Sequence, residues 1–324
     1  MSDLYPLRFQ PVYKNYIWGG RRFATALGRE LSGDGVYAES WEVADHPDGE
    51  SIIAAGPLAG KSLGELCQSR GAELLGKHHP QSIFPLLLKY LDANQNLSLQ
   101  VHPDDQCAAA MGLTDPGKTE AWYIMDAEPG SCLWAGFAEP VDRDVVEETL
   151  GTGSVEHLLH RVEPQTGDCI FVPAGTVHAI GAGLLVAEIQ QMSNNTFRLS
   201  DWGRVDAQGN PRPLHIEQGV RAIDYTSGPV EPTRGQPTET PGVTRLVGCD
   251  KFVLDRWQVQ GRNRIEGENR CLILTVTAGR LLVKGDLMSP LRRGQTVLIP
   301  AAWGSVELES QGDSPAQFLV AGLP

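Results

Sequence analysis

Hydrophobic and polar residues alternate in short runs along most of the chain, which is the pattern of β-strands with one buried face. The clearest run alternates strictly from apolar to polar: Leu97, Ser98, Leu99, Gln100, Val101 and His102. Successive side chains of a strand point to opposite faces, so we expect its three apolar residues to face a core together. The polar residues then share the other face. That face is either ordinary solvated surface or the wall of a polar site.

Two longer patterns stand out beside this alternation. Residues 84–91 are nearly continuously apolar apart from Lys89, which predicts a buried strand. Residues 61–76 carry leucines at helical spacing and end at a glycine, which predicts a helix. We expect further strands at 39–44, 119–125 and 184–190, and helices at 104–110, 145–150, 155–162 and 214–225. Residues 167–178 are expected to form a strand, a Pro-Ala-Gly turn and the start of another strand. With 36 glycines and 22 prolines between such short elements, the chain is predicted to be mainly β.

A repeated motif suggests how the chain is divided. Residues 167–178 and 294–305 both read glycine, five residues, proline and alanine, and His178 in the first copy corresponds to Ser305 in the second. The first copy fits G-x5-P-x-G-x2-H and resembles the second motif of cupin barrels. This resemblance implies a jelly roll in which the histidine points into the barrel.

The expected fold is therefore mainly β, with two cupin-type jelly-roll β-barrels and a few short helices. We assign 1–226 to a metal-binding catalytic barrel with helical insertions. Residues 227–243 contain four prolines and three glycines and are predicted to be a linker. Residues 244–324 would form a degenerate second barrel without metal ligands. This barrel is expected to cover an edge of the first.

Polar side chains from separate predicted strands form a candidate metal site inside the first barrel. Gln100 and His102 share one strand face, Glu120 lies on the next strand with Lys118, and His178 enters from the cupin-like turn. An amide oxygen, two imidazoles and a carboxylate suit one Zn²⁺ per chain with open positions for water or substrate. Cobalt, nickel, manganese and iron remain alternatives.

Composition and charge limit the classes of partner. The net charge of −13 argues against a nucleic-acid surface but leaves an anionic small molecule possible. No apolar run approaches the roughly 20 residues that cross a membrane. Residues 1–10 lack the apolar core of a secretion signal. The six cysteines are scattered and form no C-x-x-C pair, so we expect reduced thiols and a cytoplasmic protein. The sequence does not predict the oligomeric state.

Four strings closely resemble type I mannose-6-phosphate isomerases, in the shorter bacterial form: QVHPDD at 100–105, GKTEAWY at 117–123, VPAGTVHAI at 172–180 and FRLSDW at 197–202. The similarity covers most of residues 10–225 and continues more weakly in the second barrel. It implies zinc-dependent interconversion of mannose 6-phosphate and fructose 6-phosphate through an enediolate. It also implies that zinc is bound by Gln100, His102, Glu120 and His178.

The resemblance assigns further residues to the site. Arg198, Glu188 and Lys118 match active-site positions, and the substrate phosphate is expected at Lys89, Ser98 and Arg204. Trp18, in the polar and aromatic loop 14–20, is expected to line the substrate pocket. Aldose–ketose isomerisation needs a group that moves a proton between C1 and C2, and the sequence does not choose between Glu188 and Lys118.

Two other functions compete with the isomerase. One is a metal-containing cupin that binds a sugar phosphate without catalysis, and the other is an iron cupin oxygenase. The first predicts a degraded acid–base set, whereas Glu188, Lys118 and Arg198 are all present. A glutamine ligand and nearby basic residues fit the second poorly.

Overall fold

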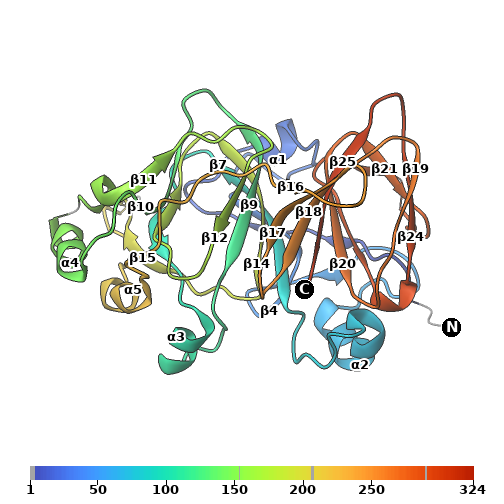
Figure 1. Cartoon of the computed structure of the whole chain (residues 1–324), viewed down its shortest axis with the longest axis horizontal. Coiled ribbons are helices and arrows are strands. Elements are labelled where there is room, and N and C mark those ends of the chain that lie inside the picture. The colour runs from blue at the N-terminus through green and yellow to red at the C-terminus, as the bar shows by residue number, and fades with distance from the viewer. Residues whose placement is uncertain (1–3, 153, 206–207, 289) are drawn as a thin grey trace.

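Two β-sandwiches lie side by side in the computed structural model, which describes residues 4–152, 154–205, 208–288 and 290–324 (Figure 1). Met1–Asp3, part of the segment expected to lack a secretion signal, lie outside the described residues. The mainly β prediction is confirmed. All six cysteines lie in the described part of the chain and are free thiols. No helix among the described residues combines the length and apolar character needed to cross a lipid bilayer.

The first sandwich has two antiparallel sheets, here called A and B. Sheet A runs in the order β12 (Cys169–Val172), β9 (Glu120–Ala127), β14 (Leu184–Gln191), β7 (Leu86–Ala93), β3 (Glu39–Val43) and β2 (Val12–Lys14). Sheet B runs in the order β11 (Leu159–Val162), β10 (Leu133–Phe137), β13 (His178–Ile180), β8 (Leu99–Val101) and β15 (Phe197–Ser200).

The second sandwich is built from sheets C and D. Sheet C runs in the order β16 (Gln236–Pro237), β17 (Val243–Gly248), β18 (Val253–Val259), β25 (Ala316–Gly322), β20 (Leu272–Ala278) and β23 (Thr296–Ile299). Sheet D runs in the order β19 (Arg262–Ile265), β24 (Val306–Ser310), β21 (Arg280–Val283) and β22 (Leu291–Arg292). An apolar cluster that includes Leu274, Val283 and Phe318 fills its interior.

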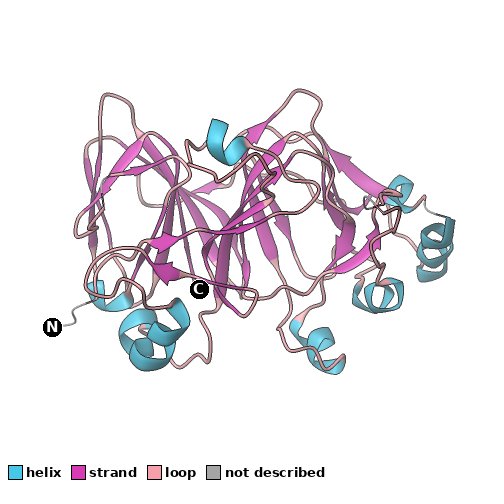
Figure 2. Cartoon of the chain, turned by 180° about the vertical axis from the view of Figure 1, so that it is seen from behind, coloured by secondary structure: helices cyan, strands magenta, loops and turns pink. Residues whose placement is uncertain are grey.

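Helices and short ribbons lie around the margins of the sandwiches (Figure 2). The helices are α1 (Arg22–Thr25), α2 (Leu63–Leu75), α3 (Asp105–Ala110), α4 (Arg143–Thr152) and α5 (Ile216–Ala222), with 3-10 turns η1 (Val155–Leu158) and η2 (Ala301–Trp303). Two ribbons pair β1 (Phe9–Gln10) with β6 (Ile52–Ile53) and β4 (Asp45–His46) with β5 (Gly49–Glu50).

Helix α2 lies within the predicted range 61–76, begins two residues later than expected, and ends at the predicted glycine. The Ser62 hydroxyl accepts a hydrogen bond from the Glu65 backbone N–H, and the Glu65 carboxylate accepts one from the Ser62 N–H. This capping box satisfies two donors at the start of the helix. Gly76 ends the helix at a φ of 58°, where a Cβ would lie 2.2 Å from the Asn269 carbonyl oxygen. Both conformation and space therefore require glycine there.

The predicted helix at 155–162 is wrong. Its first half is the 3-10 turn η1, and its second half is the edge strand β11. Leu159 and Val162 have the same i, i+3 spacing that a helix would use. As strand residues they face opposite sides of sheet B: Leu159 is buried in the cluster under α4 and α5, and Val162 in the interior of the first sandwich. Pairing with β10 provides partners for their backbone.

The two sandwiches pack back to back through the outer faces of sheets A and C. Leu88 and Tyr90 of β7 belong to the same buried cluster as Leu254 and Leu319 of sheet C. The Tyr90 hydroxyl also shares a short hydrogen bond with Thr275. The second sandwich therefore packs on the outer face of sheet A rather than on an edge of the first barrel.

The polar face of β8 turns inward, toward sheet A. Leu99 and Val101 face outward, into the cluster that packs under α4 and α5. Leu97 does not join them, contrary to the expected alternation. It lies before the start of β8 and contributes to the interior of the first sandwich. The regular alternation therefore holds from Leu99 onward, and it directs Gln100 and His102 into the barrel.

Candidate active site

Two rows of functional side chains are set by strand register, one on each sheet of the first sandwich. On sheet A, Lys89 pairs with Glu188 and Glu188 with Trp122. On sheet B, Arg198 pairs with Gln100 and Gln100 with His178. Directly paired residues project to the same face of a sheet. Register therefore brings together side chains that are up to about a hundred positions apart in the sequence.

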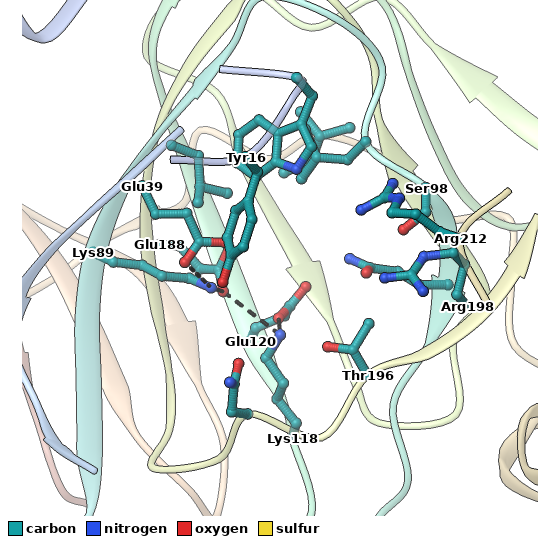
Figure 3. Close-up of a pocket in the computed structure, with 16 residues that line it drawn as sticks. Tyr16, Glu39, Lys89, Ser98, Lys118, Glu120, Glu188, Thr196, Arg198 and Arg212 are labelled. Atoms are coloured by element: carbon teal, nitrogen blue, oxygen red, sulfur yellow. Dashed lines mark ion pairs between the residues drawn. The ribbon is translucent and has the colours of Figure 1, made fainter. Parts of the chain in front are cut away.

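A pocket between these rows is lined mainly by polar side chains (Figure 3). Its polar and aromatic lining comprises Tyr16, Trp18, Glu39, Lys89, Ser98, Gln100, Lys118, Glu120, Glu188, Asn194, Thr196, Arg198 and Arg212. Of the predicted site residues, His102 and His178 are fully buried behind this lining, and Arg204 does not contribute to it.

His102, Glu120 and His178 form a buried cluster whose candidate ligand atoms lie within 4.8 Å of one another. The Nδ1 atom of His178 lies 2.8 Å from the Thr176 carbonyl oxygen, so Nδ1 carries the proton and donates it there. The Nε2 atom then presents a lone pair toward Oε1 of Glu120, 3.4 Å away. Among the described residues no hydrogen bond satisfies this Nε2. Two buried acceptors that face each other in this way fit a bound cation.

Electrostatics at the cluster favour neutral imidazoles, the form that binds metals. Burial lowers the pKa of His178 to about 4. Burial and the ammonium of Lys118 hold the pKa of His102 well below its ordinary value. The nitrogens Nε2 of His102 and Nζ of Lys118 are 3.1 Å apart. His102, Glu120 and His178 were predicted from the sequence as candidate ligands. They form one buried cluster whose chemistry fits a divalent metal.

Neighbouring side chains orient this cluster. The Trp122 indole N–H donates to Oε1 of Glu120 over 3.0 Å, and the Trp122 ring meets the His178 ring edge-on with centroids 5.3 Å apart. Gln100 lies directly across the β8–β13 ladder from His178, on the same face. Its side chain therefore projects to the same side as that of His178 and lines the pocket, and its role as a metal ligand stays a prediction.

A chain of buried charges connects the metal cluster to the opposite wall of the pocket. The Lys118 Nζ atom lies 3.0 Å from Glu120 and 4.0 Å from Glu188. The Lys89 Nζ atom lies 3.2 Å from the same Glu188 oxygen and 3.8 Å from Glu39. Burial, and then the charge of Glu120, raises the pKa of Glu188. The charge of Lys89 is thus shared between two carboxylates.

The arginines on sheet B are arranged differently. Arg198 and Arg212 both line the pocket, whereas the guanidinium of Arg204 is directed to Asp201 and to the carbonyl oxygen of Asn96. Burial, and then the nearby charge of Arg212, lowers the pKa of Arg198. This wall therefore carries more positive charge than the carboxylate of Asp201 balances.

Comparison with known proteins identifies the family. The sequence model described as "Phosphomannose isomerase type I, catalytic domain" matches residues 6–138. The mannose-6-phosphate isomerase ManA of Bacillus subtilis is 34% identical over 310 residues, which cover 95% of this chain and 97% of the relative. The chain belongs to the mannose-6-phosphate isomerase family.

Other members of the mannose-6-phosphate isomerase family show the same correspondence. The enzyme of Streptococcus mutans is 34% identical and covers 91% of this chain and 92% of its own length. The crystal structure of the Bacillus subtilis mannose 6-phosphate isomerase superposes with a TM-score of 0.88 at 31% identity, covering 98% of this chain and 99% of that one. A phosphomannose isomerase variant from Salmonella typhimurium, 16% identical, shares the fold with a TM-score of 0.82 over 99% and 100% of the two chains.

For this family member, sequence reasoning missed some of the residues that line the pocket. Arg212 and Thr196 had no local motif, although Arg212 follows the FRLSDW string by ten residues. Tyr16 lies in the same loop as Trp18, and their rings are 5.8 Å apart. Because loop 14–20 was expected to border the substrate pocket, Tyr16 could have been predicted as a pocket residue along with Trp18. Glu39 could be found only through its contact with Lys89.

Proposed function

We propose that this protein interconverts mannose 6-phosphate and fructose 6-phosphate by moving a proton between C1 and C2 through an enediolate. The observation that carries the proposal is the buried His102–Glu120–His178 cluster in contact with the Glu188 and Lys118 charges of one pocket. The family relationship supports the reaction class. The pocket supplies a place for a metal, a carboxylate base and cationic groups within reach of one small molecule.

We propose that Gln100, His102, Glu120 and His178 hold one Zn²⁺ ion, because two imidazoles with oxygen donors suit that metal and leave positions open. When bound, the metal supplies positive charge that polarises the sugar oxygens on C1 and C2. The indole N–H of Trp122 keeps the Glu120 carboxylate in place for this role. The Thr176 carbonyl does the same for the His178 ring.

We assign the proton transfer to Glu188. A base for this step needs a pKa nearer neutrality than that of an ordinary carboxyl group, and burial moves Glu188 in that direction. Its Oε1 atom lies in the pocket between two ammonium groups, and no hydrogen bond from the described residues satisfies it. Lys118 is placed to stabilise negative charge that develops on the substrate, and Arg198 adds fixed positive charge from sheet B.

The phosphate assignment of Lys89 changes on the same grounds. A lysine that binds substrate phosphate needs positive charge left over, yet Lys89 lies against both Glu188 and Glu39. We therefore propose that Lys89 holds Glu188 in position. Ser98 stays in the proposed phosphate site, since it lines the pocket two residues before Gln100.

The test is a coupled assay that follows fructose 6-phosphate formation from mannose 6-phosphate. We expect turnover by the zinc-loaded protein, loss of turnover after chelation and recovery when Zn²⁺ is restored. The non-catalytic alternative predicts binding of mannose 6-phosphate with no product. Absence of turnover by protein shown by elemental analysis to hold one zinc per chain would contradict the proposed function.

A further inference from the structure

The arginine-rich wall of the pocket carries charge that the described residues do not balance. Arg198, Arg204 and Arg212 lie around one carboxylate, that of Asp201, which is 6% exposed. Three guanidinium groups with one carboxylate leave an excess of two positive charges beside a pocket. Such an excess next to a concave surface is the electrostatic signature of an anion site.

Asp201 fixes one of these guanidinium groups in a defined orientation. The Arg212 Nε atom donates to Oδ2 of Asp201 over 2.7 Å, and Arg212 Nη2 makes a second, short hydrogen bond to Oδ1. A forked pair of this kind holds the guanidinium plane rigidly. The remaining terminal nitrogen, Nη1, has no hydrogen-bond partner in the part of the chain that the structure describes. It is available to a ligand in the pocket that Arg212 lines.

Arg204 also binds the Asp201 carboxylate, but its guanidinium is directed away from the pocket lining. Its Nη2 atom binds Asp201, and its Nη1 atom donates to the carbonyl oxygen of Asn96 over 2.6 Å. It does not line the pocket. Arg204 therefore helps to hold the Asp201 carboxylate in place. Asp201 in turn orients Arg212, which lines the pocket.

The position of Arg212 matches the end of the substrate that lies away from the reaction. Arg198 pairs with Gln100, next to the metal cluster. Ser98 lies two residues earlier, which is about 7 Å further along an extended chain. Figure 3 shows Ser98 and Arg212 on one wall of the pocket, opposite Lys89 and Glu188. In a hexose 6-phosphate, the phosphate lies at the far end of the carbon chain from C1.

We infer that Arg212, together with Ser98, binds the phosphate group of the substrate, and that Asp201 is the positioning residue that orients Arg212. This inference rests on the proposed function for the identity of the substrate. The phosphate oxygens would accept hydrogen bonds from Arg212 Nη1 and from the Ser98 hydroxyl. Arg212 was outside the phosphate set predicted from the sequence, and Arg204, which was inside it, becomes a supporting residue.

The direct test measures binding of inorganic phosphate to the zinc-loaded protein by calorimetry, which requires no turnover. We expect Arg212→Met to weaken binding about 10- to 100-fold, the factor expected from losing a charge-assisted hydrogen bond. Arg262→Met is the matched control, because that side chain is 87% exposed in sheet D. Equal weakening in both variants, or none in Arg212→Met, would overturn the inference.

Steady-state kinetics with mannose 6-phosphate provide the second readout. Arg212→Met should raise KM by a similar factor while kcat stays within about threefold of the wild-type value. Asp201→Asn should also raise KM, and the double variant should be no worse than Arg212→Met alone, which a merely structural role of Asp201 would not produce. A larger KM effect in Arg204→Met than in Arg212→Met would restore the sequence-based assignment and refute ours.

Two results keep this inference separate from the proposed function. If the wild-type protein shows no isomerase turnover but binds inorganic phosphate through Arg212, the proposed function fails and the anion site stands. If turnover is present but phosphate binding does not depend on Arg212, the proposed function stands and the anion site at Arg212 fails. Should Arg212→Met not fold, Arg212→Lys replaces it, because lysine keeps the charge but loses the forked pair with Asp201; weaker phosphate binding is still expected.

Discussion

Replacing Lys89 by methionine tests whether this lysine serves the base or the phosphate. The substitution keeps an unbranched side chain of similar length and removes only the ammonium, which lies 3.2 Å from Glu188. At that separation and an effective dielectric constant of about 20, Coulomb's law gives an attraction of about 5 kcal/mol. Removing this attraction disfavours the ionised carboxylate, so the pKa of Glu188 should rise.

This shift predicts a specific kinetic change. Burial, and then Glu120, already raises the pKa of Glu188, and loss of Lys89 moves it further in the same direction. A larger fraction of Glu188 would then be protonated at neutral pH and unable to accept the substrate proton. We expect kcat at pH 7 to fall at least about tenfold, and the acidic limb of the kcat profile to move to higher pH.

The assay is the coupled measurement of fructose 6-phosphate formation over a range of pH, with Lys89→Arg as the charge-preserving control. Lys89→Met should change kcat much more than KM, and Lys89→Arg should keep the acidic limb near its wild-type position. A phosphate ligand would behave in the opposite way. Thus a raised KM with unchanged kcat and an unshifted profile would refute our reassignment of Lys89 and support the sequence-based one.

Three further predictions concern the metal, the arginine support and the interface between the sandwiches. His178→Ala should abolish bound zinc in elemental analysis, whereas one zinc per chain in this variant would exclude His178 as a ligand. Hydrogen bonds from Arg212 and Arg204 outweigh burial and lower the pKa of Asp201, so its contribution to stability is present above its unfolded pKa of about 3.8 and is lost as pH falls through the lowered value. Acid unfolding followed by circular dichroism should therefore be less steep in Asp201→Asn below about pH 4. Tyr90→Phe, which removes the hydroxyl bonded to Thr275, should lower the stability by about 1 kcal/mol, seen as a lower Tm without a change in KM.

The sequence predicts those parts of the site that depend on local periodicity or on family strings. Alternation within 99–102 places Gln100 and His102 on one face, and the structure directs that face into the interior of the first sandwich. The cupin-like turn brings His178 to the neighbouring strand, directly opposite Gln100. These predictions succeed because a strand's side-chain period is set by its backbone and does not depend on distant contacts.

Other parts depend on choices that no local pattern records. Arg204 and Arg212 are both basic residues near the FRLSDW string, and only the three-dimensional position of Asp201 and the Asn96 carbonyl decides which one reaches the pocket. Leu159 and Val162 are spaced for a helix or for a strand with buried ends, and pairing with β10 decides between them. In each case the sequence near the residue allows two structures, and a contact with a residue distant in the sequence decides which one forms.

Sheet A shows why a chain of this family benefits from a second sandwich that has an apolar interior. Its inner face carries Lys89, Glu188 and Trp122, whereas the side chains between them, such as Leu88 and Tyr90, point outward. An outer face of this kind would be a large exposed apolar patch if the first sandwich stood alone. Sheet C buries it, which explains why residues 84–91 read as a strand covered on both faces with one lysine as the exception.

Buried charges require a backbone that holds their distances closely, because a pair of charges that separates in a low-dielectric interior loses much of its stabilisation. Packing against sheet C therefore holds the backbone that carries Lys89 and Glu188 between two buried layers.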